Sequence, residues 1–187
     1  VTIEGAFIKE PREILFYRQP ELLPGVYSVE AMVFDAKSQR SSARISTVTV
    51  PSPESRHARV SSVVIVRRAE TVKPGDRDAK NPLYVGDLLL YPDLGVPLRR
   101  RDDRELAFFF TAYGAPGTNT TGRLELLSQG RVVSSTPLAL DRFDGDGRVP
   151  QLQRIPIDAL PQGVYQLRVS IADRHGADSK TATFRIA

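Results

Sequence analysis

The stretch that decides the fold is Leu160-Pro161-Gln162-Gly163-Val164-Tyr165-Gln166-Leu167-Arg168-Val169-Ser170-Ile171-Ala172-Asp173. Pro161 fixes its own φ angle and Gly163 permits φ values that other residues avoid, so the first residues are typical of a tight turn. From Tyr165 onward an apolar residue occupies every second position, which is the period of a β-strand with one buried face. The stretch therefore predicts a turn that leads into an amphipathic strand.

The same phrase occurs near the beginning of the chain, as Leu22-Leu23-Pro24-Gly25-Val26-Tyr27-Ser28-Val29-Glu30-Ala31-Met32-Val33-Phe34-Asp35. Tyr165 lies 138 positions after Tyr27, and Asp173 lies 138 positions after Asp35. The chain therefore carries the tail of one β unit twice. A repeat of this kind indicates architecture and does not identify a substrate.

Both copies contain a Gly-x-Tyr turn, formed by Gly25 and Tyr27 in the first and by Gly163 and Tyr165 in the second. This turn resembles the corner that leads into a late strand of immunoglobulin-like sandwiches, where a tyrosine hydroxyl ties back to the backbone. We interpret the four residues as structural turn residues. The alternative is an ordinary hairpin in which each tyrosine is only an interior aromatic residue.

Strand patterns fill the rest of the chain, and no segment shows a sustained period of 3.6 residues with helix caps. Besides the two repeated strands, we expect strands near 1–10, 13–17, 43–50, 60–67, 83–91, 106–113, 123–127, 131–135, 149–157 and 181–186. The run at 106–113 is apolar on both faces, which indicates a central strand. The pattern predicts an all-β fold, specifically an immunoglobulin-like or fibronectin III-like antiparallel β-sandwich.

Proline residues divide the chain into two parts. Residues 53–58 form a Pro-containing linker, which separates a segment at 1–52 from a segment at 59–187. The first segment offers about four strands, too few for a sandwich of roughly seven strands and 100 residues. We therefore expect one complete β-sandwich domain at 59–187, preceded by a smaller or partial β domain at 1–52.

Composition limits the classes of partner. The 187 residues include 26 Lys and Arg, 22 Asp and Glu, and no Cys, with a formal net charge of +4. Because acidic and basic residues are interspersed, the chain lacks the clustered basic surface of a nucleic-acid-binding protein. No run approaches the roughly 20 apolar residues of a membrane-spanning helix. We expect a protein partner, no nucleic acid and no insertion into a membrane.

No motif in the sequence indicates catalysis, a cofactor or a metal. The acidic loop at 141–147 resembles a calcium loop, but placing Gly147 at the sixth position of an EF-hand puts Arg142 first and Gln153 twelfth, so two essential ligands are missing. His57 and His175 have no partners at zinc or triad spacing. We therefore expect no enzyme activity and interpret 141–147 as a turn.

The first copy of the repeated strand is apolar on both sides. Val26, Met32 and Phe34 lie on the face opposite Tyr27 and therefore form a candidate interaction surface. A two-faced apolar strand needs cover on both faces, which about four strands cannot supply. Residues 1–50 are therefore expected to pack against the larger domain or to take strands from upstream sequence or a partner chain.

From Val60 onward the chain resembles, block by block, the C-terminal region of bacterial von Willebrand factor A-related proteins, of the type abundant in Acidobacteria. The matching blocks are Ser61-Ser62-Val63-Val64-Ile65-Val66-Arg67-Arg68-Ala69-Glu70, Asn81-Pro82-Leu83-Tyr84-Val85-Gly86-Asp87, Tyr91-Pro92-Asp93-Leu94-Gly95, the strand from Phe108 to Tyr113, and Leu160-Pro161-Gln162-Gly163-Val164-Tyr165. The resemblance implies an exported protein of several domains. The A domain itself is absent, since no Asp-x-Ser-x-Ser metal motif occurs.

Three functions follow as hypotheses. The first is a non-enzymatic β-sandwich module of an exported bacterial protein, which acts as a spacer or as a protein–protein interaction surface. The second is a carbohydrate-binding module, in which Tyr17, Tyr84, Tyr91 and Tyr113 would form a stacking platform, although the lack of Trp counts against it. The third is an accessory domain of a secreted hydrolase, or a hydrolase itself, which the missing nucleophile motifs disfavour.

Overall fold

The computed structural model of the protein describes residues 20–52, 57–73, 75, 83–114, 119–140 and 143–187. Over these residues the regular elements are all β-strands, and the strands pair antiparallel throughout. A single isolated parallel bridge in this part of the chain joins Leu98 to Ile186. The prediction of an all-β antiparallel protein is confirmed, while the immunoglobulin-like sandwich stays a prediction.

The described part of the chain contains a series of strands separated by turns and loops. In order they are β1 (Gly25–Asp35), β2 (Arg40–Val50), β3 (Arg59–Val60), β4 (Val64–Thr71), β5 (Tyr84–Val85), β6 (Leu88–Pro92), β7 (Glu105–Tyr113), β8 (Thr121–Ser128), β9 (Arg131–Leu138), β10 (Arg148–Pro156), β11 (Gly163–Asp173) and β12 (Gly176–Ile186). The two repeated stretches of sequence form β1 and β11.

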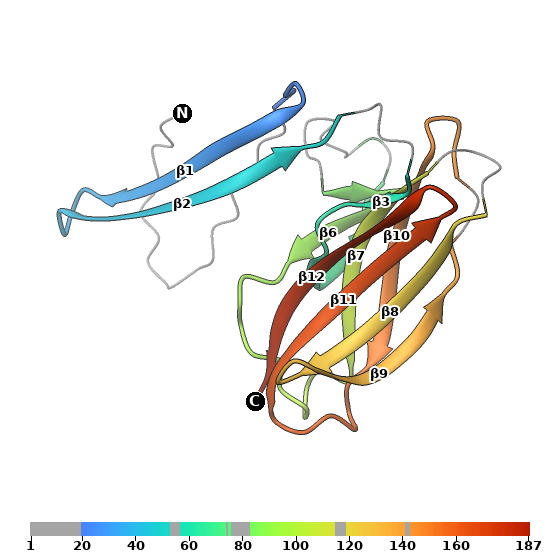
Figure 1. Ribbon diagram of the computed structural model, residues 1–187. Coiled ribbons are helices and arrows are strands. Elements are labelled where there is room, and N and C mark those ends of the chain that lie inside the picture. Colours follow the sequence, from blue (N-terminus) through green and yellow to red (C-terminus); the bar gives the residue numbers. More distant parts are fainter. Residues whose placement is uncertain (1–19, 53–56, 74, 76–82, 115–118, 141–142) are drawn as a thin grey trace.

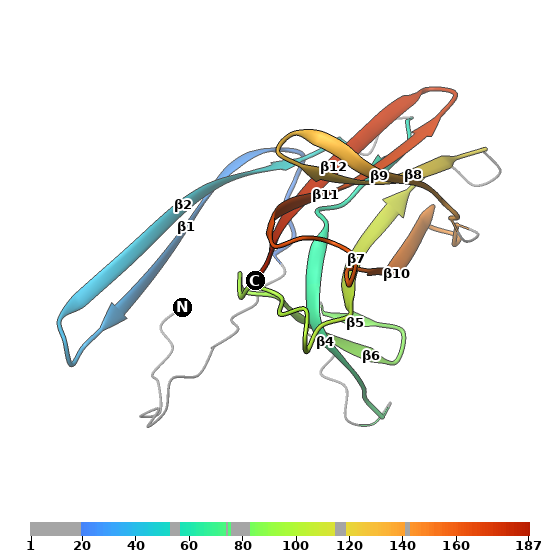
Figure 2. The same ribbon diagram turned by 90° about the horizontal axis from the view of Figure 1, so that it is seen from below.

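These strands form three sheets. β1 and β2 pair only with each other, as a long hairpin. A six-stranded sheet has the order β10-β7-β4-β6-β5, with β3 also paired to β7, and a four-stranded sheet has the order β12-β11-β8-β9. The hairpin projects away from the other two sheets (Figure 1). Seen from below, the four-stranded sheet lies over β7 and β10 of the six-stranded sheet (Figure 2).

One buried apolar cluster joins the six-stranded sheet to the four-stranded sheet. Every second residue of β7 is buried in it, and the residues concerned are Leu106, Phe108, Phe110 and Ala112. The Phe108 and Phe110 rings stack with their centroids 6.2 Å apart. From the other sheet, β11 and β12 contribute side chains that include Tyr165 and Phe184, whose rings stack at 5.6 Å. Because β7 lies between β10 and β4, it is an internal strand, as the apolar run at 106–113 predicts.

Two-residue turns close the hairpins of the four-stranded sheet. Between β8 and β9, Gln129 and Gly130 both have positive φ angles, 50° and 77°. This backbone conformation matches the right-handed twist of the flanking strands. The hairpin that the sequence predicts across 128–130 is therefore present.

The expected strand at 83–91 is wrong in one respect. Instead of one strand, the structure has β5 and β6, which pair with each other across Gly86 and Asp87. Gly86 has a φ angle of 60°, a conformation that glycine adopts without steric cost. The strand expected at 60–67 is also displaced, since β4 begins at Val64. The strands expected at 1–10 and 13–17 lie outside the described residues.

Candidate functional site

The two copies of the repeated stretch form nearly the same local structure. The Tyr27 hydroxyl donates a hydrogen bond to the Leu23 carbonyl oxygen at 2.8 Å, and the Tyr165 hydroxyl donates one to the Pro161 carbonyl oxygen at 2.9 Å. Each tyrosine thus ties back to the backbone four residues upstream. This is the contact found at the corner of immunoglobulin-like sandwiches.

The glycine of each turn lies beneath the tyrosine ring. A Cβ atom added to Gly25 would come within 3.5 Å of the Tyr27 ring, and one added to Gly163 would come within 3.7 Å of the Tyr165 ring. The hairpins also share their length, because β1, β2, β11 and β12 each contain 11 residues. The repeat in the sequence is therefore a repeat of a complete hairpin.

The surroundings of the two hairpins differ. β11 pairs with β8 along its second edge, and only 4% of Tyr165 is exposed. β1 pairs with β2 alone among the described strands, and Tyr27 is partly exposed. The same hairpin is thus built into the core at one end of the sequence and stands uncovered by described residues at the other.

The candidate interaction surface on the first hairpin is exposed. Met32 and Phe34 are 76% and 58% exposed, and Val26 is exposed as well. In the register of the hairpin, Ile45 of β2 lies opposite Glu30, on the same face as these three residues, and is also exposed. We call Val26, Met32, Phe34 and Ile45 the outer face of the hairpin.

The opposite side carries a second apolar group. Tyr27, Val29 and Val33 alternate with the outer-face residues along β1, and Val48 lies directly across from Tyr27. Val29, Val33 and Val48 are exposed. We call these four residues the tyrosine face. No described strand outside the hairpin packs substantially on β1 or β2. One alternative from the sequence is that this segment packs against the larger domain, and the described strands do not show such packing.

Carboxylates in and near the turn between β11 and β12 form hydrogen bonds with the first residues of the larger unit. One oxygen of the Asp173 carboxylate accepts a hydrogen bond from the Ala58 backbone N–H at 2.8 Å, and the Asp178 carboxylate accepts one from the Val60 N–H at 3.0 Å. Ala58, which the sequence places at the end of the linker, is fully buried. These contacts join residues more than 100 positions apart, which no local sequence pattern indicates.

Asp173 also closes its own turn. Its second carboxylate oxygen accepts hydrogen bonds from the backbone N–H groups of His175 and Gly176, at 2.7 and 3.1 Å. Desolvation is the largest single influence on the pKa of Asp173 and raises it, but the hydrogen bonds from His175, Ala58 and Gly176 together outweigh this effect and hold the pKa below its usual value. The ionised carboxylate is therefore the form that the fold stabilises.

The low pKa of Asp173 predicts a pH-dependent contribution to stability. A carboxylate whose pKa is lower in the folded state stabilises the protein above its unfolded pKa of about 3.9, and this contribution is lost as the pH falls through the folded pKa. We expect Asp173→Asn to lower the free energy of unfolding at pH 7 and to make it fall less steeply below about pH 4. Urea denaturation between pH 7 and pH 2 measures both quantities. Asp158→Asn, at an exposed aspartate, is the control, and equal slopes for the two variants would contradict the prediction.

The two histidines are close in space, which the sequence does not indicate. His57 packs against Gly176, whose added Cβ would lie 3.2 Å from the His57 Cβ, and Gly176 directly follows His175. The His175 Nε2 atom accepts a hydrogen bond from the Arg174 side chain at 3.0 Å. Among the described residues, no group of three or more His, Cys, Asp or Glu side chains is arranged to hold a metal ion.

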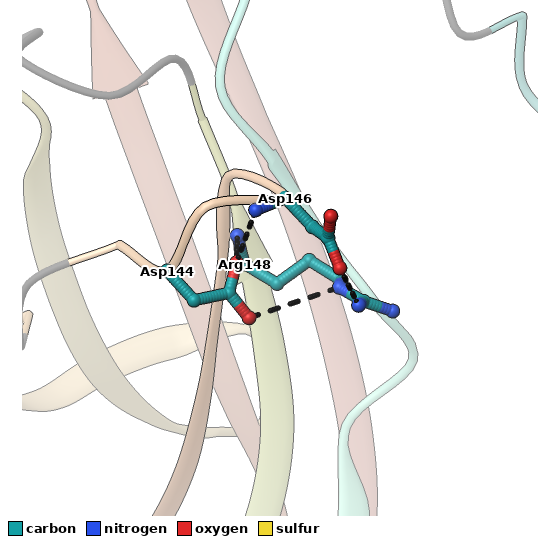
Figure 3. Close-up of polar contacts among 3 residues, drawn as sticks. All are labelled: Asp144, Asp146 and Arg148. Carbon is teal, nitrogen blue, oxygen red and sulfur yellow. Dashed lines mark hydrogen bonds and ion pairs between the residues drawn. The ribbon is translucent and has the colours of Figure 1, made fainter.

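The acidic loop has the contacts of a turn. The Asp144 carboxylate accepts hydrogen bonds from the backbone N–H groups of Asp146 and Arg148, at 2.9 and 2.8 Å. The Arg148 guanidinium pairs with the carboxylates of both Asp144 and Asp146 (Figure 3). Both carboxylates therefore form ion pairs with Arg148. Residues 141 and 142 of the loop lie outside the described residues.

Residues of the charged loop at 99–104 also form polar contacts with other parts of the protein. The Asp103 carboxylate pairs with the Arg67 guanidinium at 3.1 Å and accepts a hydrogen bond from the Arg99 N–H at 2.8 Å. Arg100 donates to the Asp158 carbonyl oxygen at 2.8 Å. These contacts attach the loop to neighbouring segments, so we interpret it as a structural surface loop.

The described tyrosines proposed as a sugar platform lie in two separate places. Tyr84 of β5 pairs with Leu89 and so lies near Tyr91 on the same face of β5–β6, whereas Tyr113 lies elsewhere in the sheet. The Arg68 guanidinium covers the Tyr91 ring at 4.1 Å from its centroid, and the Tyr91 hydroxyl donates to the Glu70 carboxylate at 2.9 Å. This hydrogen bond is the main cause of a raised Tyr91 pKa. Tyr113 is the last residue of β7 and pairs with Arg148 of β10. It lies six residues along β7 from Ala107, which pairs with Val66 of β4. Tyr91 pairs with Arg68, which lies beyond Val66 on the side away from Tyr113. At about 3.3 Å per residue, Tyr91 and Tyr113 are therefore more than roughly 20 Å apart. Tyr17 lies outside the described residues.

Comparisons with known proteins do not assign a family. No family model matches the chain, and no curated protein matches its sequence. In the part of the chain that the structure describes, no helix is long and apolar enough to cross a membrane. Among the described residues, the molecule contains two equivalent hairpins, of which one is covered and the other is not.

Proposed function

We propose that the chain is a non-enzymatic structural module of an exported bacterial protein, in which residues 57–187 form an immunoglobulin-like sandwich and the β1–β2 hairpin binds protein. Strand order supports the sandwich. Along the chain, β7 and β10 pair in one sheet, whereas β8–β9 and β11–β12 are hairpins of the other, so the connections cross between sheets as they do in Greek-key sandwiches. The tyrosine corner at Tyr165 supports the same assignment.

The outer face of the hairpin carries the proposal of protein binding. In the covered copy, the counterparts of Met32 and Phe34 are Ser170 and Ala172, which are small. The repeated architecture therefore does not require large apolar side chains at these two positions. Met32 and Phe34 are nevertheless both large and exposed, and clustered exposed apolar side chains are typical of protein-binding surfaces.

The exported location rests on the resemblance of the chain to von Willebrand factor A-related proteins. A spacer or binding module is consistent with that context, because exported proteins of several domains are commonly assembled from β-sandwich units. The contacts of the charged and acidic loops support a structural role, since Asp103, Asp144 and Asp173 each stabilise a turn or a strand connection.

A site-specific photocrosslinker tests the outer face. The crosslinking residue replaces Met32 in the protein expressed in its own bacterium, and intact cells are irradiated. We expect one adduct of defined mass, reduced at least about tenfold by Phe34→Ala, because central aromatic residues dominate binding energy. The same crosslinker at Gln166, at an exposed position of β11, is the matched control. Absence of an adduct at position 32, or equal adducts at 32 and 166, would contradict protein binding by this face.

A further inference from the structure

The tyrosine face of the open hairpin corresponds to the core face of the covered hairpin. Tyr165, Leu167, Val169 and Ile171 of β11 are buried, and their counterparts in β1 are Tyr27, Val29, Ala31 and Val33. Across each hairpin the tyrosine pairs with an apolar residue, which is Phe184 for Tyr165 and Val48 for Tyr27. On β1, the side that corresponds to the core side of β11 is therefore apolar as well.

Two kinds of cover protect the core face of β11–β12. The first is edge pairing, because β8 runs antiparallel to β11 and places Leu126 beside Leu167 and Leu124 beside Val169. The second is a facing layer, because Phe108 and Phe110 of β7 belong to the same buried cluster as the β11 side chains. Both β7 and β8 precede β11 in the chain, since β7 begins at Glu105 and β11 begins at Gly163.

The β1–β2 hairpin lacks both kinds of cover among the described residues. The second edge of β1 has no partner strand there, and Val29 and Val33 are exposed. A two-stranded hairpin is marginally stable by itself in water and needs further strands or a packed face. Its ladder of 11 paired residues and its tyrosine corner are nevertheless those of a finished domain.

We propose that β1–β2 is the closing hairpin of a second β unit of the same design as residues 57–187, and that strands preceding β1 in the polypeptide pair with its free edge and cover the tyrosine face. These strands would take the positions that β8 and β7 take on β11–β12. The source is assigned from the repeat, because β7 and β8 end more than 30 positions before β11 begins, and the same distance ahead of β1 lies before Val1. The protein would then carry at least two such units in tandem.

This inference rests on the proposed function in one respect, since it assigns a partner to one face of the same hairpin and leaves the outer face for protein binding. The two faces alternate along β1, so one residue step separates a position of one kind from a position of the other. Completion of the unit would bury Val29 and Val33, whose counterparts are Leu167 and Ile171, but would leave Met32 and Phe34 partly exposed, as Ser170 and Ala172 are. The two proposals can therefore fail separately.

Thiol labelling tests the assignment, because the chain contains no cysteine. Val29→Cys and Val33→Cys report on the tyrosine face, and Met32→Cys reports on the outer face. Each variant is made in the 187-residue chain and in the natural full-length protein, and its maleimide labelling rate is compared with that of free cysteine. Thermal unfolding of each variant shows that the unit at 57–187 is folded.

We expect all three thiols to label rapidly in the 187-residue chain. In the full-length protein, Cys at positions 29 and 33 should label at least ~100-fold more slowly, because labelling then requires local unfolding of a packed sheet, whereas Cys at position 32 should stay within ~10-fold of its rate in the shorter chain. The difference between adjacent faces distinguishes completion of the unit from general burial of the hairpin.

Four results would overturn the inference. The natural reading frame could begin at or near Val1, leaving no strands to supply. Cys at positions 29 and 33 could label rapidly in the full-length protein. Protection of these positions in the 187-residue chain that grows with protein concentration would make a second copy the occupant. Protection at position 32 with rapid labelling at position 29 would retain protein binding by the outer face and reject the second unit.

Discussion

Replacing Phe108 by alanine is expected to lower the free energy of unfolding by about 3–5 kcal/mol. Phe108 is fully buried at the centre of β7, where its ring stacks on Phe110. It belongs to the cluster that joins the six-stranded and four-stranded sheets, so alanine would leave a cavity between them. Guanidinium denaturation followed by far-ultraviolet circular dichroism measures the change.

The matched control for Phe108 is Val133→Ala in β9. Val133 also lies in a strand, but it is 53% exposed, and surface substitutions usually change stability by less than about 0.5 kcal/mol. Similar losses for the two variants would show that Phe108 does not lie in a shared core, and the arrangement of the two sheets described above would then be wrong.

The sequence predicts the strands well because their signals are local. Alternation from Tyr165 to Ile171 and the glycine-containing turn at 128–130 each depend on neighbouring residues, and both are found in the structure. The division of 83–91 into β5 and β6 is also local. The Gly86-Asp87 pair in the middle of the run is a hairpin turn signal that could have predicted it.

The sequence cannot predict which residues the fold brings together from a distance. Asp173 holds the backbone of Ala58, and Asp178 holds that of Val60, although each pair is separated by most of the larger unit. Hydrogen bonds to backbone N–H groups leave no trace in the identity of the donor residue. The same limit applies to the tyrosines, because the distance between Tyr91 and Tyr113 depends on strand register rather than on spacing in the sequence.

The two faces of the β1–β2 hairpin could be predicted from the sequence only in part. Alternation in β1 shows that both sides are apolar, and this much the sequence predicts. The repeat aligns the Tyr27 side of β1 with the Tyr165 side of β11, but only the structure shows that the second is buried while Val29 and Val33 on the first are exposed. The candidate surface formed by Val26, Met32 and Phe34 is part of the outer face, to which the structure adds Ile45 of β2.

The central claim is that one hairpin occurs twice, inside the core at β11–β12 and open at β1–β2. Tyr165→Phe and Tyr27→Phe remove the same hydrogen bond from the two copies. At Tyr165 the loss leaves the Pro161 carbonyl oxygen without this donor at a partly buried site, where the cost is about 1–2 kcal/mol. At Tyr27 the bond is exposed and Tyr27 does not belong to the buried cluster, so its loss should not affect unfolding of the larger unit.

The most direct measurement is the unfolding free energy of the unit at 57–187 in the 187-residue chain, determined by guanidinium denaturation for the wild type and for both variants. We predict a loss of about 1–2 kcal/mol for Tyr165→Phe and a change of less than about 0.5 kcal/mol for Tyr27→Phe. Equal losses would show that the first hairpin is an integral part of the larger unit, which would contradict the claim that it stands open.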